Sequence, residues 1–188
     1  MNIRQKYILN KEAQVYRYTS QNSLDAKKVY ENLYKDIGCT YIIYMYEDLI
    51  ANKKYIYSSN WEWQNLLIGE KLINNCPIFL AAFKYLEKKR TGCIFLPWVF
   101  SPPQNLTERN VCGLRSEFNI ANGFGYGAKE DGVRETLAFA GDIQDKDFYK
   151  NFMEKNTFFY KTLLEMRKII FPRNCNENQL ANSREIKK

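Results

Sequence analysis

Residues that could perform catalysis are sparse in this chain of 188 residues. The chain contains no histidine, which excludes His-based triads, histidine metal ligands and imidazole acid–base catalysis. The five cysteines are odd in number, widely spaced and without a Cys-x-x-Cys pair, which argues against a disulfide framework and a zinc site. The acidic residues Glu130, Asp131 and Glu135 gather near an expected hairpin tip, and no nucleophile–base pair accompanies them. We therefore expect a protein that is not an enzyme and holds neither a metal nor a cofactor.

A second group of residues suits binding better than catalysis. Asp131-Gly132 is a turn signal between two β-prone runs, so the stretch from Phe118 to Gly141 is predicted to form a hairpin. Small residues recur along this hairpin: Gly123, Gly125, Gly127, Ala138 and Ala140. Glycine inside a strand often marks the close approach of a backbone or a ligand. This part of the sheet is either the floor of a pocket or a tightly packed sheet centre.

The composition indicates a folded protein with one core. Apolar residues make up 45% and aromatic residues 15%, which excludes a disordered chain. The formal net charge is +7, but the basic residues come in short groups, which favours a solvated surface over a nucleic-acid or membrane interface. No apolar run is long enough to span a bilayer, and the N-terminus lacks a signal-peptide core. We expect a cytoplasmic protein without a membrane partner.

The elements that position these residues follow from periodicity and turn signals. Strands are predicted at 40–46, 54–59, 91–99, 123–128 and 133–140. Helices are predicted from about Lys11 to Gly38, at 61–74, at 78–89, from Asn105 to about Asn119, and as one long helix capped by Asp145 and stopped by Pro172. Antiparallel hairpins with helices on both sides give an α+β, three-layer α/β/α sandwich. Residues 1–172 are predicted to form one domain, and residues 173–188 a disordered polar tail.

From Tyr41 to about Ile170 the chain resembles the autoinducer-binding domain of bacterial LuxR-type quorum-sensing transcription regulators. Four segments carry the resemblance: Ser59-Asn60 followed by Trp63, Cys76-Pro77, Pro97-Trp98, and Phe118-Asn119-Ile120-Ala121-Asn122-Gly123 before the hairpin. The resemblance implies a central antiparallel five-stranded sheet between helices, akin to PAS and GAF modules. It also implies that a ligand sits between the sheet and one helical layer.

The resemblance assigns roles to individual residues of that site. Trp63 matches a tryptophan whose indole N–H donates to the ligand's head group, and Trp98 matches a second tryptophan that packs on it. Two positions depart from the family pattern, because Leu67 replaces a tyrosine and Cys76 replaces an aspartate that accepts the N–H of an acyl-homoserine lactone. The expected ligand-binding residues are Trp63, Leu67, Cys76, Trp98, Gly123, Tyr57 and Ala138.

These departures shape the expected function. Loss of a buried acceptor should cost the amide of a lactone about 1–3 kcal/mol, so we expect a small apolar signal that is not an ordinary acyl-homoserine lactone. The resemblance further implies a homodimer, or a heterodimer that modulates a full-length regulator. The chain ends at Lys188, so we expect no helix-turn-helix reader and no binding to a specific DNA site. The alternative is a partner-binding protein or effector that kept the scaffold with a vestigial pocket.

Overall fold

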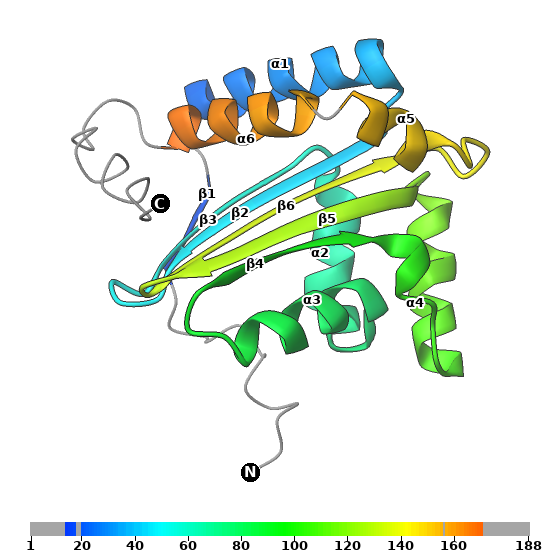
Figure 1. Cartoon of the computed structure of the whole chain (residues 1–188), viewed down its shortest axis with the longest axis horizontal. Coiled ribbons are helices and arrows are strands. Elements are labelled where there is room, and N and C mark those ends of the chain that lie inside the picture. The colour runs from blue at the N-terminus through cyan, green and yellow to red at the C-terminus, as the bar shows by residue number, and fades with distance from the viewer. Residues whose placement is uncertain (1–13, 18–19, 156, 171–188) are drawn as a thin grey trace, which may run out of the picture.

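The computed structural model describes residues 14–17, 20–155 and 157–170, and within these residues six strands form a single sheet (Figure 1). The strands are β1 (Gln14–Arg17), β2 (Tyr41–Asp48), β3 (Lys53–Ser58), β4 (Gly92–Pro97), β5 (Ala121–Glu130) and β6 (Val133–Gly141). Their order is β1-β3-β2-β6-β5-β4, and neighbours run antiparallel except for β1, which is parallel to β3. The predicted five-stranded antiparallel sheet is confirmed, with a short sixth strand added at one edge.

Helices cover both faces of this sheet, which confirms the predicted α/β/α sandwich (Figure 1). One face carries α1 (Ser20–Ile37), α5 (Phe148–Glu154) and α6 (Thr157–Ile170). The other face carries α2 (Trp61–Gly69), α3 (Pro77–Glu87) and α4 (Leu106–Glu117). Two short 3₁₀ turns complete the second layer: η2 (Leu72–Asn75) joins α2 to α3, and η3 (Trp98–Phe100) follows β4.

The helices of the second layer begin where the sequence provides capping residues. The side chain of Asn60 accepts a hydrogen bond of 2.9 Å from the backbone N–H of Trp63, which starts α2. Pro77 occupies the first turn of α3, where its missing N–H costs nothing. The side chain of Asn105 accepts a 2.9 Å bond from the N–H of Glu108 at the start of α4. These caps fix where each helix begins along the sheet.

The sheet divides the buried apolar residues into two clusters. On the side of α1, α5 and α6, Phe124 stacks on Phe139 with ring centroids 5.3 Å apart, and Phe152 lies 4.4 Å and 4.9 Å from them. We call this the aromatic core. On the side of α2, α3 and α4 lies a smaller group, which we call the tryptophan cluster: Tyr41, Trp63, Leu67, Cys76, Trp98, Val111, Ile120 and Ala140.

Three helix predictions are wrong. The helix predicted at 61–74 ends at Gly69 and is followed by the separate turn η2, because Lys71 between them adopts the left-handed conformation with φ of 56°. The N-terminal helix begins at Ser20, because residues Gln14–Arg17 instead pair with β3, and sheet pairing overrides a local helix preference there. The predicted last helix is two helices, α5 and α6, separated at Lys155. Lys155 ends α5 by donating to the carbonyl of Phe152 and then accepts a 2.9 Å bond from the N–H of Phe158.

Two further predictions concern residues that the structure does not describe. The polar tail at 173–188 lies outside the described residues, and so does the N-terminal part of the domain before Gln14. The domain bounds of 1–172 therefore stay a prediction.

Candidate ligand-binding site

The small residues of the hairpin differ in how much room they leave. A Cβ atom on Gly123 would lie 2.2 Å from the backbone oxygen of Phe139 and 2.8 Å from ring atoms of Trp98. A Cβ atom on Gly125 would have Ala138 Cβ and Trp98 Nε1 as its nearest neighbours, both at 3.9 Å. The sheet face is therefore tightly packed at Gly123 and leaves room for further atoms at Gly125.

Trp98 is placed by the turn that follows β4. Pro97 is the last residue of β4 and pairs with Phe124, so the chain enters η3 directly beside β5. The Trp98 side chain is only 9% exposed. Its indole Nε1 is buried and has no hydrogen-bond partner among the described residues. Because an indole N–H can only donate, the site contains a buried donor that lacks an acceptor.

A second unsatisfied donor comes from Arg115 on α4. The guanidinium carbon lies 4.5 Å from the centroid of the Trp98 ring, in a cation–π arrangement. Nε donates a 3.1 Å bond to the carbonyl of Ile120, whereas the buried Nη1 has no partner in the described part of the chain. Because a guanidinium stays charged, this stacked pair combines a positive charge with two free N–H donors.

Trp63 and Leu67 reach the same cluster from α2. They are four residues apart, so they lie on one face of the helix. Trp63 is 2% exposed, and its ring centroid lies 5.6 Å from that of Phe118, the residue that follows α4. The Asn60 cap fixes the start of α2 and thereby the height of Trp63 above the sheet.

Cys76 joins the cluster from the start of α3, where it is buried. Burial raises the pKa of the thiol above its ordinary value and outweighs the lowering effects of backbone hydrogen bonds from Phe79 and Ile78 and of the charge on Arg115. The thiol therefore stays protonated and neutral near pH 7. It cannot supply the negative charge that an aspartate would supply at this position.

Two other polar side chains of this region, those of Tyr41 and Gln64, pair with each other. The Tyr41 hydroxyl donates a 3.3 Å hydrogen bond to Oε1 of the buried Gln64. Burial raises the pKa of Tyr41, although a hydrogen bond with Ser58 opposes the shift, so the hydroxyl stays neutral. In the described part of the chain three buried side-chain polar atoms remain without a partner: Trp98 Nε1, Arg115 Nη1 and Ser101 Oγ. The first two can only donate, so they require an acceptor.

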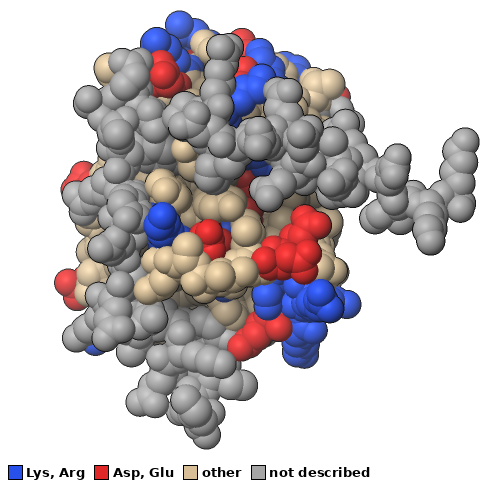
Figure 2. Space-filling view, turned by 90° about the vertical axis from the view of Figure 1, so that its left-hand side faces the viewer, with Lys and Arg blue, Asp and Glu red and all other residues tan. Residues whose placement is uncertain are grey.

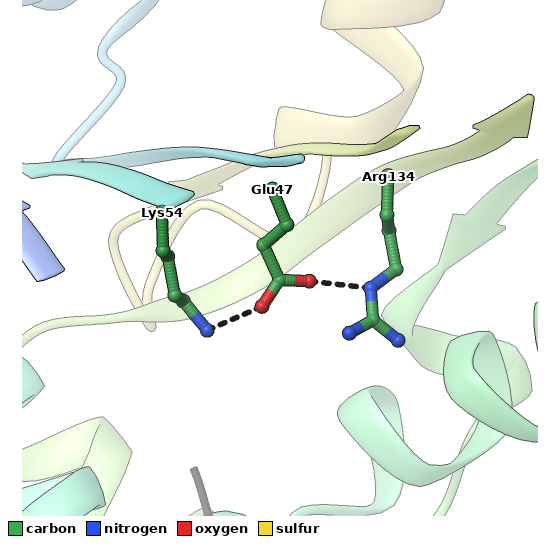
Figure 3. A network of polar contacts seen from close by, with 3 residues as sticks. All are labelled: Glu47, Lys54 and Arg134. Atoms are coloured by element: carbon green, nitrogen blue, oxygen red, sulfur yellow. Dashed lines mark hydrogen bonds and ion pairs between the residues drawn. The ribbon is translucent and has the colours of Figure 1, made fainter. Parts of the chain in front are cut away.

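A separate ionic network lies on the same side of the sheet, near the ends of β2 and β6 (Figure 3). Glu47 accepts 2.7 Å and 2.5 Å hydrogen bonds from Lys54 Nζ and Arg134 Nε. Burial would raise the pKa of Glu47, but the two cations outweigh it and hold the pKa below its ordinary value. Arg134 also lies 5.0 Å from the ring of Phe83 on α3, which ties this helix to the sheet.

Six of the seven predicted site residues come together on one face of the sheet. Trp63, Leu67, Cys76, Trp98 and Ala138 belong to or pack against the tryptophan cluster, and Gly123 lies directly under Trp98. Tyr57 is the exception, because it belongs to the aromatic core on the opposite face. Successive side chains of a strand point to opposite faces, so the neighbouring Ser58 lies on the side of the cluster instead.

The sequence reasoning missed Arg115 and Gln64. Arg115 stands four residues after the buried Val111, so it lies on the inward stripe of α4, and that spacing was the available signal. Gln64 follows Trp63 directly and carries no comparable signal. A charged or amide side chain at such a position is normally assigned to the surface.

Two of the three acidic residues expected near the hairpin tip, Glu135 and Asp131, have structural partners. Glu135 is not at the tip: it is buried on the side of the aromatic core, where Tyr44 donates to it and Arg167 forms an ion pair with it. Asp131, at the tip, lies 3.7 Å from Arg90. On the face of the molecule at the hairpin tips, basic and acidic side chains lie interspersed (Figure 2). This mixture favours the solvated surface predicted for the basic groups.

No group of three or more Cys, Asp or Glu side chains in the described ranges is arranged to hold a metal ion. No helix within those ranges is long and apolar enough to cross a membrane.

Comparison with solved structures identifies the class to which this fold belongs. No family model matches the sequence, and none of the curated proteins matches it. The structure is similar to the N-acylhomoserine lactone-dependent LuxR-family transcription factor CepR2 from Burkholderia cenocepacia, with a TM-score of 0.50 and 13% identity, over 84% of this chain and 100% of that one. Escherichia coli SdiA matches with a TM-score of 0.48 and 10% identity, over 80% of this chain and 64% of that one. The chain thus has the fold of a LuxR-family autoinducer-binding domain.

Proposed function

We propose that this protein is a small-molecule-binding regulatory module of the LuxR quorum-sensing type. The observation that carries the proposal is the unsatisfied indole N–H of Trp98, buried beside the open backbone of Gly125 and among apolar side chains. A buried donor without a partner costs about 1–3 kcal/mol, so it is normally retained where an acceptor arrives. The fold shared with CepR2 supports a ligand at this face.

The ligand differs in chemistry from the N-acylhomoserine lactone on which CepR2 depends. The amide N–H of an acyl-homoserine lactone needs an acceptor, and the neutral thiol of Cys76 is a poor one. Leu67 adds apolar surface in place of a hydroxyl. A small apolar signal fits this site better than a lactone.

The module acts by binding and not by catalysis. The chain has no histidine, and burial raises the pKa of the Cys39 thiol to about 12 and that of Cys76 above its ordinary value. Neither buried thiol is therefore a ready nucleophile. Regulation proceeds through association in the cytoplasm with a second copy or a related full-length regulator.

Native mass spectrometry of freshly purified protein tests whether a small molecule co-purifies with the protein. Thermal-shift measurements with acyl-homoserine lactones, hydroxyketones and fatty acids follow, since a ligand at a hundredfold its Kd adds about 2.7 kcal/mol of stability. Trp98→Phe removes the indole donor and should weaken the response, whereas Trp61→Phe, a half-exposed tryptophan, should not. A strong shift with a lactone would contradict the assigned chemistry.

The tight contact between Trp98 and Gly123 favours one competing function. Side chains already fill that part of the face, as expected for a partner-binding protein or effector with a vestigial pocket. Absence of any co-purified compound, together with no thermal response to the panel, would favour this alternative.

A further inference from the structure

Most of the buried polar atoms without a partner near the tryptophan cluster are hydrogen-bond donors that cannot accept. In the described part of the chain, three buried side-chain polar atoms lack a hydrogen-bond partner: Trp98 Nε1, Ser101 Oγ and Arg115 Nη1. All three come from η3, the residue after it, and α4. Two of them can only donate, and these two belong to one stacked pair, with the guanidinium 4.5 Å from the indole centroid.

The positive charge of Arg115 is not compensated by any carboxylate in the described residues. The ion pairs found there do not include Arg115. Its one protein acceptor is the backbone carbonyl of Ile120. Cys76, which lies within electrostatic range, holds a neutral thiol. A partly buried cation without a counter-charge is unfavourable until an anion supplies one.

The surroundings of this pair are apolar. Gly125 and Ala138 form the sheet floor beside Trp98 Nε1. Aliphatic and aromatic side chains of the helical layer pack against the tryptophan cluster: Leu66, Leu72, Ile73, Ile78, Phe79 and Leu114. The hydroxyl proton of Tyr41 is already committed to Gln64. A ligand that satisfies this site must therefore combine an acceptor-only, negatively charged end with an apolar body.

We infer that the site binds an amphipathic carboxylic acid, with its carboxylate on Arg115 and Trp98 and its aliphatic chain among the apolar side chains of α2, η2 and α3. A carboxylate presents two acceptor oxygens and no donor, which matches two neighbouring N–H donors and one positive charge. This inference rests on the proposed function, and it adds an anionic head group to the apolar body of the signal proposed there.

Decanoate and methyl decanoate are a matched pair of probes for isothermal titration calorimetry, because they share the chain and differ in charge. The purified protein is expected to bind decanoate about tenfold to a hundredfold more tightly than the ester, the range given by hydrogen bonds to a charged group. Arg115→Gln should remove that preference, because it removes the positive charge while its amide N–H can still donate to the carbonyl oxygen that both probes share. Arg109→Gln is the matched control, since it removes one charge from an exposed position on α4.

Cys76→Asp gives a second, independent readout. A carboxylate at position 76 supplies Arg115 with an internal counter-charge, so decanoate should lose affinity relative to the ester. Equal affinity of acid and ester in the unmutated protein, or an unchanged preference in Arg115→Gln, overturns the inference but leaves the proposed binding function standing. Binding of neither probe overturns the inference, and the proposed function then falls as well if native mass spectrometry and the wider panel also show no ligand.

Discussion

Gly123 and Gly125 lie two residues apart on β5, and substitution by alanine should change the stability of the protein at only one of them. Gly123→Ala would place a methyl group 2.2 Å from a backbone oxygen and 2.8 Å from Trp98, so something must shift. We expect a loss of about 1–3 kcal/mol in the free energy of unfolding, which urea denaturation measures. Gly125→Ala meets nothing closer than 3.9 Å and should change stability by less than about 1 kcal/mol.

The same pair separates stability from binding. Because the methyl group of Gly125→Ala would occupy space beside Trp98 Nε1, this variant should lose ligand affinity while keeping its stability. A Gly125→Ala protein that binds the co-purified ligand as well as the unmutated protein does would show that the ligand lies elsewhere.

Cys76→Asp restores an acceptor for an amide N–H. We expect the variant to bind acyl-homoserine lactones more tightly than the unmutated protein, by about tenfold, since a hydrogen bond to a charged group contributes about 1.5–3 kcal/mol and part of this is lost to desolvation. Titration calorimetry with one lactone measures the change. Cys76→Asn keeps the size without the charge and is the control.

At the scale of elements, the ionic network of Glu47, Lys54 and Arg134 connects three strands and, through Phe83, helix α3. Glu47→Gln should destabilise the protein by about 3–5 kcal/mol, because it leaves two cations without their carboxylate. The exposed pair of Lys27 and Glu31 on α1 is the comparison, and Glu31→Gln should cost less than about 1 kcal/mol.

The same carboxylate predicts a dependence on pH. The folded-state pKa of Glu47 is lowered from its ordinary value of 4.5, so its contribution to stability is present above that pH and is lost as the pH falls through the folded pKa. The free energy of unfolding should therefore decline on acidification below about pH 4.5. The decline should be smaller in Glu47→Gln, and identical slopes in both proteins would contradict this assignment.

Periodicity and turn signals predicted the strands β2 to β6 and the capped starts of α2, α3 and α4, because those signals are local. They failed for α5 and α6, since the apolar spacing of Phe148, Phe152, Phe159 and Leu163 continues in phase across the break at Lys155. They failed for β1, whose strand exists only through pairing with β3.

The site residues emerged from the family resemblance, and Tyr57 was misplaced because composition does not indicate which face of a strand a residue occupies.

At the scale of the whole molecule, the layer of α1 and α6 leaves apolar side chains exposed. Tyr160 and Leu164 on α6 are 61% and 52% exposed, and Leu24 and Tyr34 on α1 are exposed as well. We expect these residues to contribute to self-association, and sedimentation at high micromolar concentration measures it. Leu164→Glu should shift the protein toward monomer without unfolding it, whereas Lys161→Glu, on the same helix, should not. A pure monomer in the unmutated protein would refute the prediction.

The division of apolar residues between two sides of the sheet has a practical consequence for engineering. The aromatic core lies across the sheet from the site, and it is the larger of the two hydrophobic clusters. We therefore expect libraries at Leu67, Cys76 and Ala138 to keep the fold while they are screened for new specificities. A variant that no longer self-associates, such as Leu164→Glu, would leave the side of α1 and α6 free to carry a fluorescent reporter, and the molecule becomes a starting point for biosensors.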